Sequence, residues 1–199
     1  MRKETPWGVW DHLPLEQVVS IFTGFSKPWW IAGGFAIDAF AGIGRREHDD
    51  VDVCVFASDH LAVQEHLRDW QLQYADPPGK LNPWPRGFEL PAEVHDIWAR
   101  GSEDDPWRFQ LMLNPGGPAE LVFRRDERIS VPLERALFLK DSVRYLVPDY
   151  QLLFKSRGRR EKDERDLEDC LPLLKESQRA WLKQALELTD SANPWLGRL

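Results

Sequence analysis

Two acidic residues lie one residue apart in a segment that otherwise has the pattern of a buried strand. The segment is DVDVCVF, residues 50–56, and it places Asp50 and Asp52 on one face because the side chains of a strand alternate. Their Cα atoms are expected roughly 6.5–7 Å apart from the strand rise. Two carboxylates at that spacing can converge on one divalent ion, or on two ions about 3.5–4 Å apart. A metal would also relieve the cost of two like charges beside a core.

A simpler interpretation is that EHDD, residues 47–50, is a solvated loop and that the two acids lie on an exposed sheet face. The residues upstream favour phosphate chemistry instead. Gly33 and Gly34 form a turn before an apolar helical segment, and such a turn lets a phosphate approach main-chain amides and the positive end of a helix. The order Gly-Gly, helix, Asp-x-Asp therefore predicts a phosphate site beside a metal site.

These residues resemble the opening motif of the nucleotidyltransferase superfamily with the polymerase-β-like fold, above all its aminoglycoside and lincosamide branch. That branch has Gly-Gly-Trp-Ala-Ile-Asp and then Arg-x-His-x-Asp-hydrophobic-Asp. The matching residues here are Gly33, Gly34, Phe35, Ala36, Ile37 and Asp38, followed by Arg46, His48, Asp50, Val51 and Asp52. Phe35 in place of Trp is the one departure. A second segment, residues 152–170, is similar to the Lys and Arg-Lys-Asp elements on the helical part of related enzymes, while the middle strands are diverged.

The resemblance implies Mg²⁺-dependent transfer of a nucleoside monophosphate from an NTP, with ATP favoured, to a hydroxyl of a small molecule such as an antibiotic. Asp50 and Asp52 would hold the metal and the triphosphate. The other residues expected to bind the nucleotide are Gly33, Gly34, Arg46, His48, Lys155 and Lys162. A structural hydrogen bond is an equally good interpretation of His48, and a solvated helix end is an alternative for Lys155. Asp163 and Asp166 share a helix face and are expected to position Lys155 or Lys162.

A third carboxylate usually comes from a neighbouring strand, where it completes the metal site or takes the proton of the acceptor. We predict Asp96, in EVHDIWAR, for this role, with Glu93 as the second choice. A strand-end acid on the solvent side is the alternative interpretation of Asp96. The strand RFQLMLN, residues 108–114, offers Gln110 and no acid, so catalysis would be in doubt if the third acid belonged there.

The elements expected around these residues form an α+β fold with a mixed sheet, flanking helices and a C-terminal helical part. We expect a nucleotidyltransferase domain over residues 1–147 and a helical part over residues 148–199 packed on it. Strands are predicted within residues 28–32, 50–56, 70–75, 93–100, 108–114 and 120–126. Helices are predicted at 14–25, 35–43, 58–70, 149–158, 160–174 and 177–189.

The composition limits the classes of partner that we expect the protein to bind. The 199 residues carry a net charge of −7, which argues against broad nucleic-acid binding. No apolar run approaches the roughly 20 residues of a membrane span, and no signal core is present, so we expect a cytoplasmic protein without a membrane partner. Cys54 and Cys170 show neither metal-site nor disulfide spacing.

The acceptor is expected in a cleft between the sheet and the helical part. Trp84, Trp98 and Trp107 could line it or pack in the core, and an acidic rim containing Glu89, Glu93 or Asp105 would suit a cationic acceptor. Two other functions remain open at this point. The acceptor could be a protein or a tRNA, as in toxin–antitoxin nucleotidyltransferases, or the chain could bind a nucleotide without transferring it.

Overall fold

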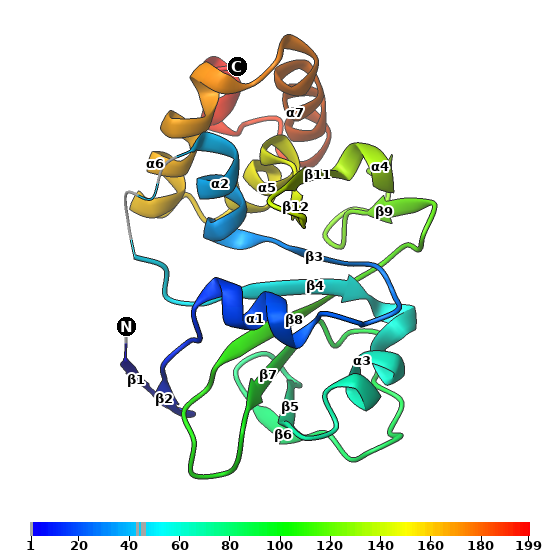
Figure 1. Ribbon diagram of the computed structural model, residues 1–199. Coiled ribbons are helices and arrows are strands. Elements are labelled where there is room, and N and C mark those ends of the chain that lie inside the picture. Colours follow the sequence, from blue (N-terminus) through cyan, green and yellow to red (C-terminus); the bar gives the residue numbers. More distant parts are fainter. Residues whose placement is uncertain (1, 43, 45–46) are drawn as a thin grey trace.

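The computed structural model describes residues 2–42, 44 and 47–199, and Figure 1 labels its elements. Arg46, expected to bind phosphate, lies outside the described residues. The helices are α1 (Leu15–Ile21), α2 (Gly33–Ala41), α3 (His60–His66), α4 (Leu133–Ala136), α5 (Pro148–Lys155), α6 (Glu161–Cys170) and α7 (Glu176–Thr189). The strands are β1 (Lys3–Thr5), β2 (Gly8–Trp10), β3 (Trp29–Ile31), β4 (Asp52–Phe56), β5 (Gln71–Ala75), β6 (Leu81–Pro83), β7 (Asp96–Arg100), β8 (Phe109–Asn114), β9 (Glu120–Val122), β10 (Ser130–Pro132), β11 (Leu137–Lys140) and β12 (Val143–Leu146).

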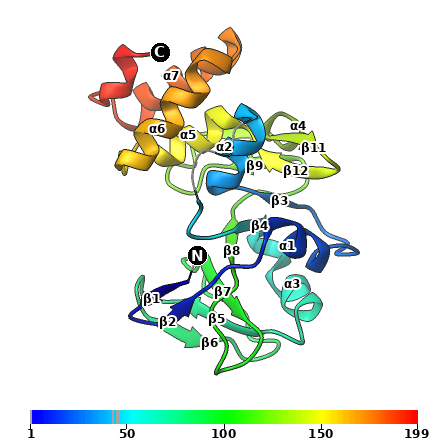
Figure 2. The same cartoon turned by 60° about the vertical axis from the view of Figure 1, so that its left-hand side comes forward.

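A mixed sheet runs through the molecule in the strand order β11-β12-β3-β4-β8-β7-β5-β6 (Figures 1 and 2). Strand β4 pairs antiparallel with β3 and parallel with β8. Strand β7 pairs antiparallel with β8 and is therefore one strand further from β4. Two short hairpins, β1-β2 and β9-β10, are separate from this sheet. The mixed sheet with its helices confirms the predicted α+β fold.

The two faces of the sheet have different surroundings. Paired residues on neighbouring strands point to the same side, so Asp52, Gln110 and Trp98 form one row across β4, β8 and β7. The opposite face is apolar and is covered by α1 and α3, where Phe22 contacts Phe109 with ring centroids 6.0 Å apart. Asp52 of β4 therefore lies on the face away from α1 and α3.

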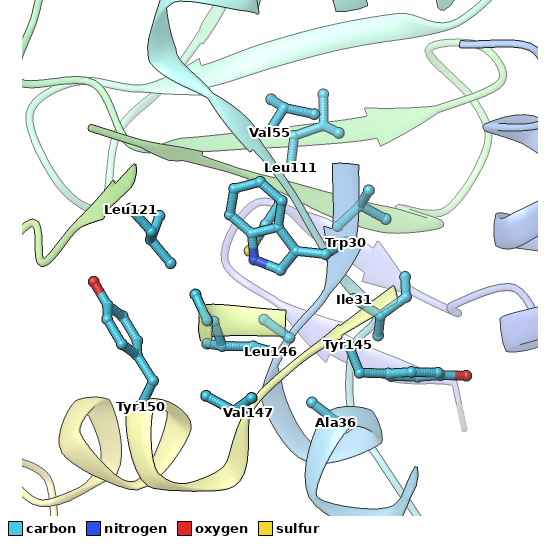
Figure 3. Close-up of a cluster of buried hydrophobic side chains, with 14 of the residues drawn as sticks. Trp30, Ile31, Ala36, Val55, Leu111, Leu121, Tyr145, Leu146, Val147 and Tyr150 are labelled. Atoms are coloured by element: carbon cyan, nitrogen blue, oxygen red, sulfur yellow. The ribbon is translucent and has the colours of Figure 1, made fainter. Parts of the chain in front are cut away.

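The C-terminal helices lie together at the β3–β12 end of the molecule (Figure 2). Figure 3 shows how α5 joins the core, with Val147 and Tyr150 near Leu146, Leu121 and Trp30. The change from strands to helices falls at Val147, where the sequence predicts it, because Pro148 occupies the first turn of α5. The division into domains 1–147 and 148–199 stays a prediction. Of the helices in the described part of the chain, none is long and apolar enough to cross a membrane.

The structure differs from the sequence-based prediction mainly in short elements. The hairpin β1-β2 and the strands β10 to β12 were not predicted, because three- and four-residue strands leave too little alternation to detect. The strand that carries the acids begins at Asp52, so Asp50 belongs to the segment leading into β4. Helix α2 ends at Gly42, one of the two glycines expected to stop it.

Candidate active site

Gly33 brings the start of α2 directly against Asp52. The pairing of β3 with β4 continues into a hydrogen bond from the Ala32 N–H to the Asp52 carbonyl oxygen, 3.0 Å long. Gly33 has φ +68°, and a Cβ added there would lie 2.3 Å from Oδ2 of Asp52. Only glycine fits this close approach in a left-handed conformation. The Gly33 N–H already donates to Oε1 of Gln151 at 2.8 Å, so Gln151 holds the amide that was expected to bind phosphate.

Asp50 and Asp52 both line a cavity of about 440 Å³ between the sheet and helices α5 and α6. The pKa of Asp52 is raised from 3.8 to about 7, chiefly by burial and next by the negative charge of Asp50, while Lys155 opposes both effects. A divalent cation between the two carboxylates would relieve their repulsion, and Mg²⁺ is commonly held by one or two carboxylates together with substrate phosphates. The donor set therefore fits Mg²⁺ that arrives with a nucleotide.

Cationic side chains line the same cavity. They are Arg124 and Arg125 after β9, Lys155 on α5, Arg160 before α6 and Lys162 on α6. Burial lowers the pKa of Arg125, and repulsion from Arg124, Arg157 and Arg160 lowers it further. Such crowding of guanidinium groups favours a polyanionic ligand, because an anion would offset the repulsion and accept charge-assisted hydrogen bonds. The predicted rim of Glu89, Glu93 and Asp105 does not line this cavity, whose charged side chains are more often basic than acidic.

Two aspartates on α6 fix the position of Lys155. Its Nζ lies 2.6 Å from Oδ2 of Asp166 and 3.5 Å from Oδ1 of Asp163. Asp163 also accepts a hydrogen bond from the Arg160 N–H at 3.0 Å, which caps α6. Of the two predicted alternatives, Asp163 and Asp166 therefore position Lys155. Lys162 lies 3.5 Å from Asp49 instead, which joins α6 to the loop before β4.

His48 lines the cavity, and a side chain of α2 holds its buried imidazole in place. Its Nε2 lies 2.6 Å from Oδ2 of Asp38 on α2, and its ring centroid is 4.4 Å from that of Phe35. Among the described residues, His48 is therefore a partner of Asp38. The neighbouring Cys54 also lines the cavity, and burial raises the pKa of its thiol to about 12, so the thiolate is not available as a nucleophile.

Asp96 lies on the same face of the sheet as Asp52, although it is not among the residues that line the cavity. In register, Asp96 lies opposite Met112 of β8, which lies opposite Cys54 of β4. This offset of two strands and two residues puts the Cα atoms of Asp96 and Asp52 roughly 12 Å apart. Oδ1 of Asp96 is buried without a hydrogen-bond partner among the described residues, 3.7 Å from Nη1 of Arg124, and the charge of Asp96 helps to raise the pKa of Asp52. The role of Asp96 as the third carboxylate stays a prediction.

Strand β8 supplies no acid in that place. The residues that it presents on the face of Asp52 are Gln110, Met112 and Asn114. Glu93, the second choice, is exposed before β7 and does not line the cavity. Within residues 2–42, 44 and 47–199, no group of three His, Cys, Asp or Glu side chains is arranged to hold a metal ion.

The family model of aminoglycoside-2''-adenylyltransferase matches residues 14–170. The chain belongs to this family. It is accordingly a nucleotidyltransferase, and the order of glycines, helix and paired acids on which the resemblance depended lies inside the matched region. No curated protein sequence shows a significant match to the chain.

Solved structures of nucleotidyltransferases share the fold. The lincosamide antibiotic adenylyltransferase LnuA, with lincomycin bound, has 15% sequence identity and a TM-score of 0.54, covering 80% of this chain and 97% of its own. ANT(2")-Ia in complex with adenylyl-2"-tobramycin has 13% identity and a TM-score of 0.57, covering 87% of this chain and 95% of its own. These similarities support the polymerase-β-like fold, and the structural match extends along most of the chain.

Sequence reasoning missed three groups at the site of this family member. Arg124 and Arg125 are adjacent basic residues directly after a strand, a signal that was present but was assigned no role. Gln151 lies on α5, where no local pattern distinguishes it from other helix residues. The hairpin β1-β2 precedes residue 14, so it lies outside the region that matches the family.

Proposed function

We propose that this nucleotidyltransferase moves AMP from Mg-ATP to a hydroxyl of a small molecule, releasing pyrophosphate. The observation that carries the proposal is the pair Asp50 and Asp52 in one cavity with five cationic side chains. A metal-binding carboxylate pair beside such a cluster suits a metal-bound triphosphate. The ligands named for the similar structures, lincomycin and an adenylylated tobramycin, make an antibiotic the first acceptor class to test.

In this proposal Asp50 and Asp52 hold the metal, and Arg124, Arg125, Lys155, Arg160 and Lys162 bind and orient the phosphates. When bound, Mg²⁺ would neutralise charge that builds up on the phosphates and lower the pKa of a hydroxyl that it contacts. Asp163 and Asp166 keep Lys155 directed at the cavity. His48, held by Asp38, supports the wall beside the acids. Asp96, beside Arg124, would complete the metal site or take the proton of the acceptor.

A second candidate is a protein that binds Mg-ATP without transferring AMP. It is favoured by Gln110, Met112 and Asn114, which occupy the site-facing positions of the strand next to β4. A third carboxylate on a neighbouring strand would ordinarily complete the metal site or take the proton of the acceptor.

Two measurements test the proposal and separate it from this alternative. Calorimetry with Mg²⁺ and a non-hydrolysable ATP analogue measures nucleotide binding. Transfer of label from ATP radiolabelled at the α-phosphate to lincomycin or tobramycin measures the reaction. Binding with transfer supports the proposed function. Binding without transfer to any hydroxylated acceptor in a broad panel supports the second candidate, and the absence of both overturns both functions.

Asp96→Asn tests whether a third acid takes part. We expect the transfer rate of this variant to fall by about 10²–10⁴-fold, the usual contribution of a positioned general base, while Mg-ATP binding is retained. The reason is that Oδ1 of Asp96 is buried on the face of Asp52 without a hydrogen-bond partner in the described part of the chain, and that the charge of Asp96 acts on Asp52. Steady-state kinetics of label transfer check the rate, and Glu93→Gln serves as the matched control. A rate within about tenfold of the wild type in Asp96→Asn would exclude Asp96 as the base.

A further inference from the structure

A second pocket lies beside the first and shares Asp50 with it. It has a volume of about 140 Å³ and is lined by Lys3, Thr5, Trp10, Asp49, Asp50, Trp98 and Gln110. Asp50 is also part of the wall of the large cavity. Two elements that are far apart in sequence form the remaining walls, namely the N-terminal hairpin β1-β2 and the site face of β8 and β7. The small pocket is therefore placed where a molecule could approach a nucleotide held by Asp50 and Asp52.

The hairpin that forms this wall is fastened to the sheet domain by main-chain hydrogen bonds. The Trp107 N–H donates to the Val9 carbonyl oxygen at 2.8 Å, and the Asp11 N–H donates to the Trp107 carbonyl oxygen at 3.0 Å. The indole N–H of Trp107 donates to the Trp7 carbonyl oxygen at 2.8 Å. These bonds hold the turn and β2 in place, and β1 is held by its pairing with β2. The wall is therefore pre-organised to receive a ligand.

The pocket presents aromatic surface between charged groups that already have partners. The rings of Trp10 and Trp98 meet edge to face with centroids 4.8 Å apart. At the rim, Asp49 lies 3.9 Å from Lys3 and 3.5 Å from Lys162. Asp50 is a metal ligand in the proposed function. These groups favour an apolar ring over a cluster of ammonium groups as the occupant of the pocket.

The size of the pocket limits what part of an acceptor it can hold. An apolar protein cavity of about 150 Å³ accommodates one benzene molecule, so a pocket of this size takes one ring. Trp98 lies in the same row as Gln110 and Asp52, so a ring against Trp98 would place a hydroxyl on the same molecule near the two acids.

We propose that the pocket formed by Trp10, Trp98 and Gln110 is the acceptor subsite, and that it selects a hydroxylated small molecule bearing an apolar ring. This inference rests on the proposed function, because it takes Asp50 and Asp52 as the place where the nucleotide is held. It assigns acceptor selection to a hairpin outside the family match of residues 14–170. The members of the subsite act by binding and orienting the acceptor.

The test compares two glucosides that differ only in the aglycone, which is a phenyl ring in one and a methyl group in the other. Phenyl β-glucoside and methyl β-glucoside are titrated, with Mg²⁺ and a non-hydrolysable ATP analogue present, into protein labelled with 5-fluorotryptophan. Fluorine NMR then reports binding, and the Trp98 and Trp10 signals are assigned from the variants Trp98→Leu and Trp10→Phe. We expect the phenyl sugar to bind at least about tenfold more tightly, which is the gain in affinity expected from one stacked ring. It should also shift both tryptophan signals.

Three variants decide the assignment. Trp98→Leu removes the stacking surface and Gln110→Phe fills the pocket, so each should reduce the preference for the phenyl sugar to about threefold or less. The matched control is Phe88→Leu, which changes an exposed aromatic side chain that lines neither pocket. It should keep the preference. Circular dichroism identifies any variant that fails to fold, and two independent variants keep the test decisive.

The outcomes separate this inference from the proposed function. Equal binding of both sugars by the wild type, or a preference retained in folded Trp98→Leu and Gln110→Phe, would overturn the subsite. Titration of the same samples with the ATP analogue tests nucleotide binding separately. Nucleotide binding that is normal in every variant, together with a lost ring preference, supports the subsite. A wild type without nucleotide affinity refutes the proposed function and, with it, the assignment of the pocket to an acceptor.

Discussion

Asp52→Asn is expected to lose nucleotidyl transfer by more than about 100-fold, since removal of an outer-shell partner alone typically costs 10–100-fold at a metal site. The substitution keeps the shape of the side chain and removes one of the two anionic ligands proposed for the metal. Gly33 leaves room for this carboxylate at the start of α2, where any larger residue would collide with it. Calorimetry with Mg²⁺ and an ATP analogue should show the loss of affinity, and label transfer should show the loss of rate.

The same substitution should stabilise the metal-free protein at alkaline pH. The pKa of Asp52 is raised from 3.8 to about 7, chiefly by burial, so the folded protein binds this proton more tightly than the unfolded chain. The bound proton therefore contributes fully to the free energy of unfolding below pH 4, and this contribution declines as pH rises towards 7. Asparagine does not titrate, so the variant lacks this pH-dependent contribution to stability. We expect the variant to gain on the order of 2 kcal/mol over the wild type at pH 8.

Thermal unfolding in the presence of a chelator checks this expectation. The melting temperature of Asp52→Asn should exceed that of the wild type at pH 8, and the difference should shrink towards pH 4 as the wild-type carboxyl is protonated. Addition of Mg²⁺ and the ATP analogue should stabilise the wild type and leave the variant unchanged. Asp69→Asn, on a residue exposed after α3, serves as the control. Wild-type affinity for Mg-ATP in Asp52→Asn would refute the metal-binding role.

The acids and the glycine could be predicted because they depend on local chain geometry. An Asp-x-Asp in an alternating strand fixes which side chains share a face, and Gly33 follows a short strand that must turn into a helix. The structure adds the reason for the glycine, which is the closeness of Oδ2 of Asp52. The helices after Val147 were predicted for a similar reason, since their apolar periodicity spans several turns.

The distance of Asp96 from the paired acids could not be predicted, because strand order is not a local property. Both EVHDIWAR and RFQLMLN have the pattern of strands, and nothing within either segment says which one pairs with β4. The structure places β8 between β4 and β7, which puts Met112 between Cys54 and Asp96. Arg124 and Arg125 reach the cavity from a turn between two three-residue strands, and their place depends on long-range packing against Phe154. Such contacts are set by tertiary structure, and the sequence pattern does not contain them.

Lys155→Met is expected to weaken both folding and nucleotide binding. The ammonium group is buried between Asp163 and Asp166, and the substitution would leave both carboxylates inside the protein without it. Removal of one partner from a buried ion pair typically costs about 3–5 kcal/mol. Asp163 keeps its hydrogen bonds with Arg160, so we expect about 3 kcal/mol, the lower end of that range. For a chain of this size that is a fall of roughly 10 °C in melting temperature.

The pH dependence of this loss distinguishes a buried charge from simple loss of packing. Without Lys155 the nearby carboxylates should titrate at higher pH in the folded state, so the deficit should be largest near pH 8 and should shrink as they are protonated. The double variant Lys155→Met with Asp166→Asn should recover part of the stability. Lys183→Met, on the exposed face of α7, is the matched control and should change stability by less than about 0.5 kcal/mol. An equal deficit at every pH, unaffected by Asp166→Asn, would mean that Lys155 contributes through its aliphatic chain and that α6 does not position a charge for the triphosphate.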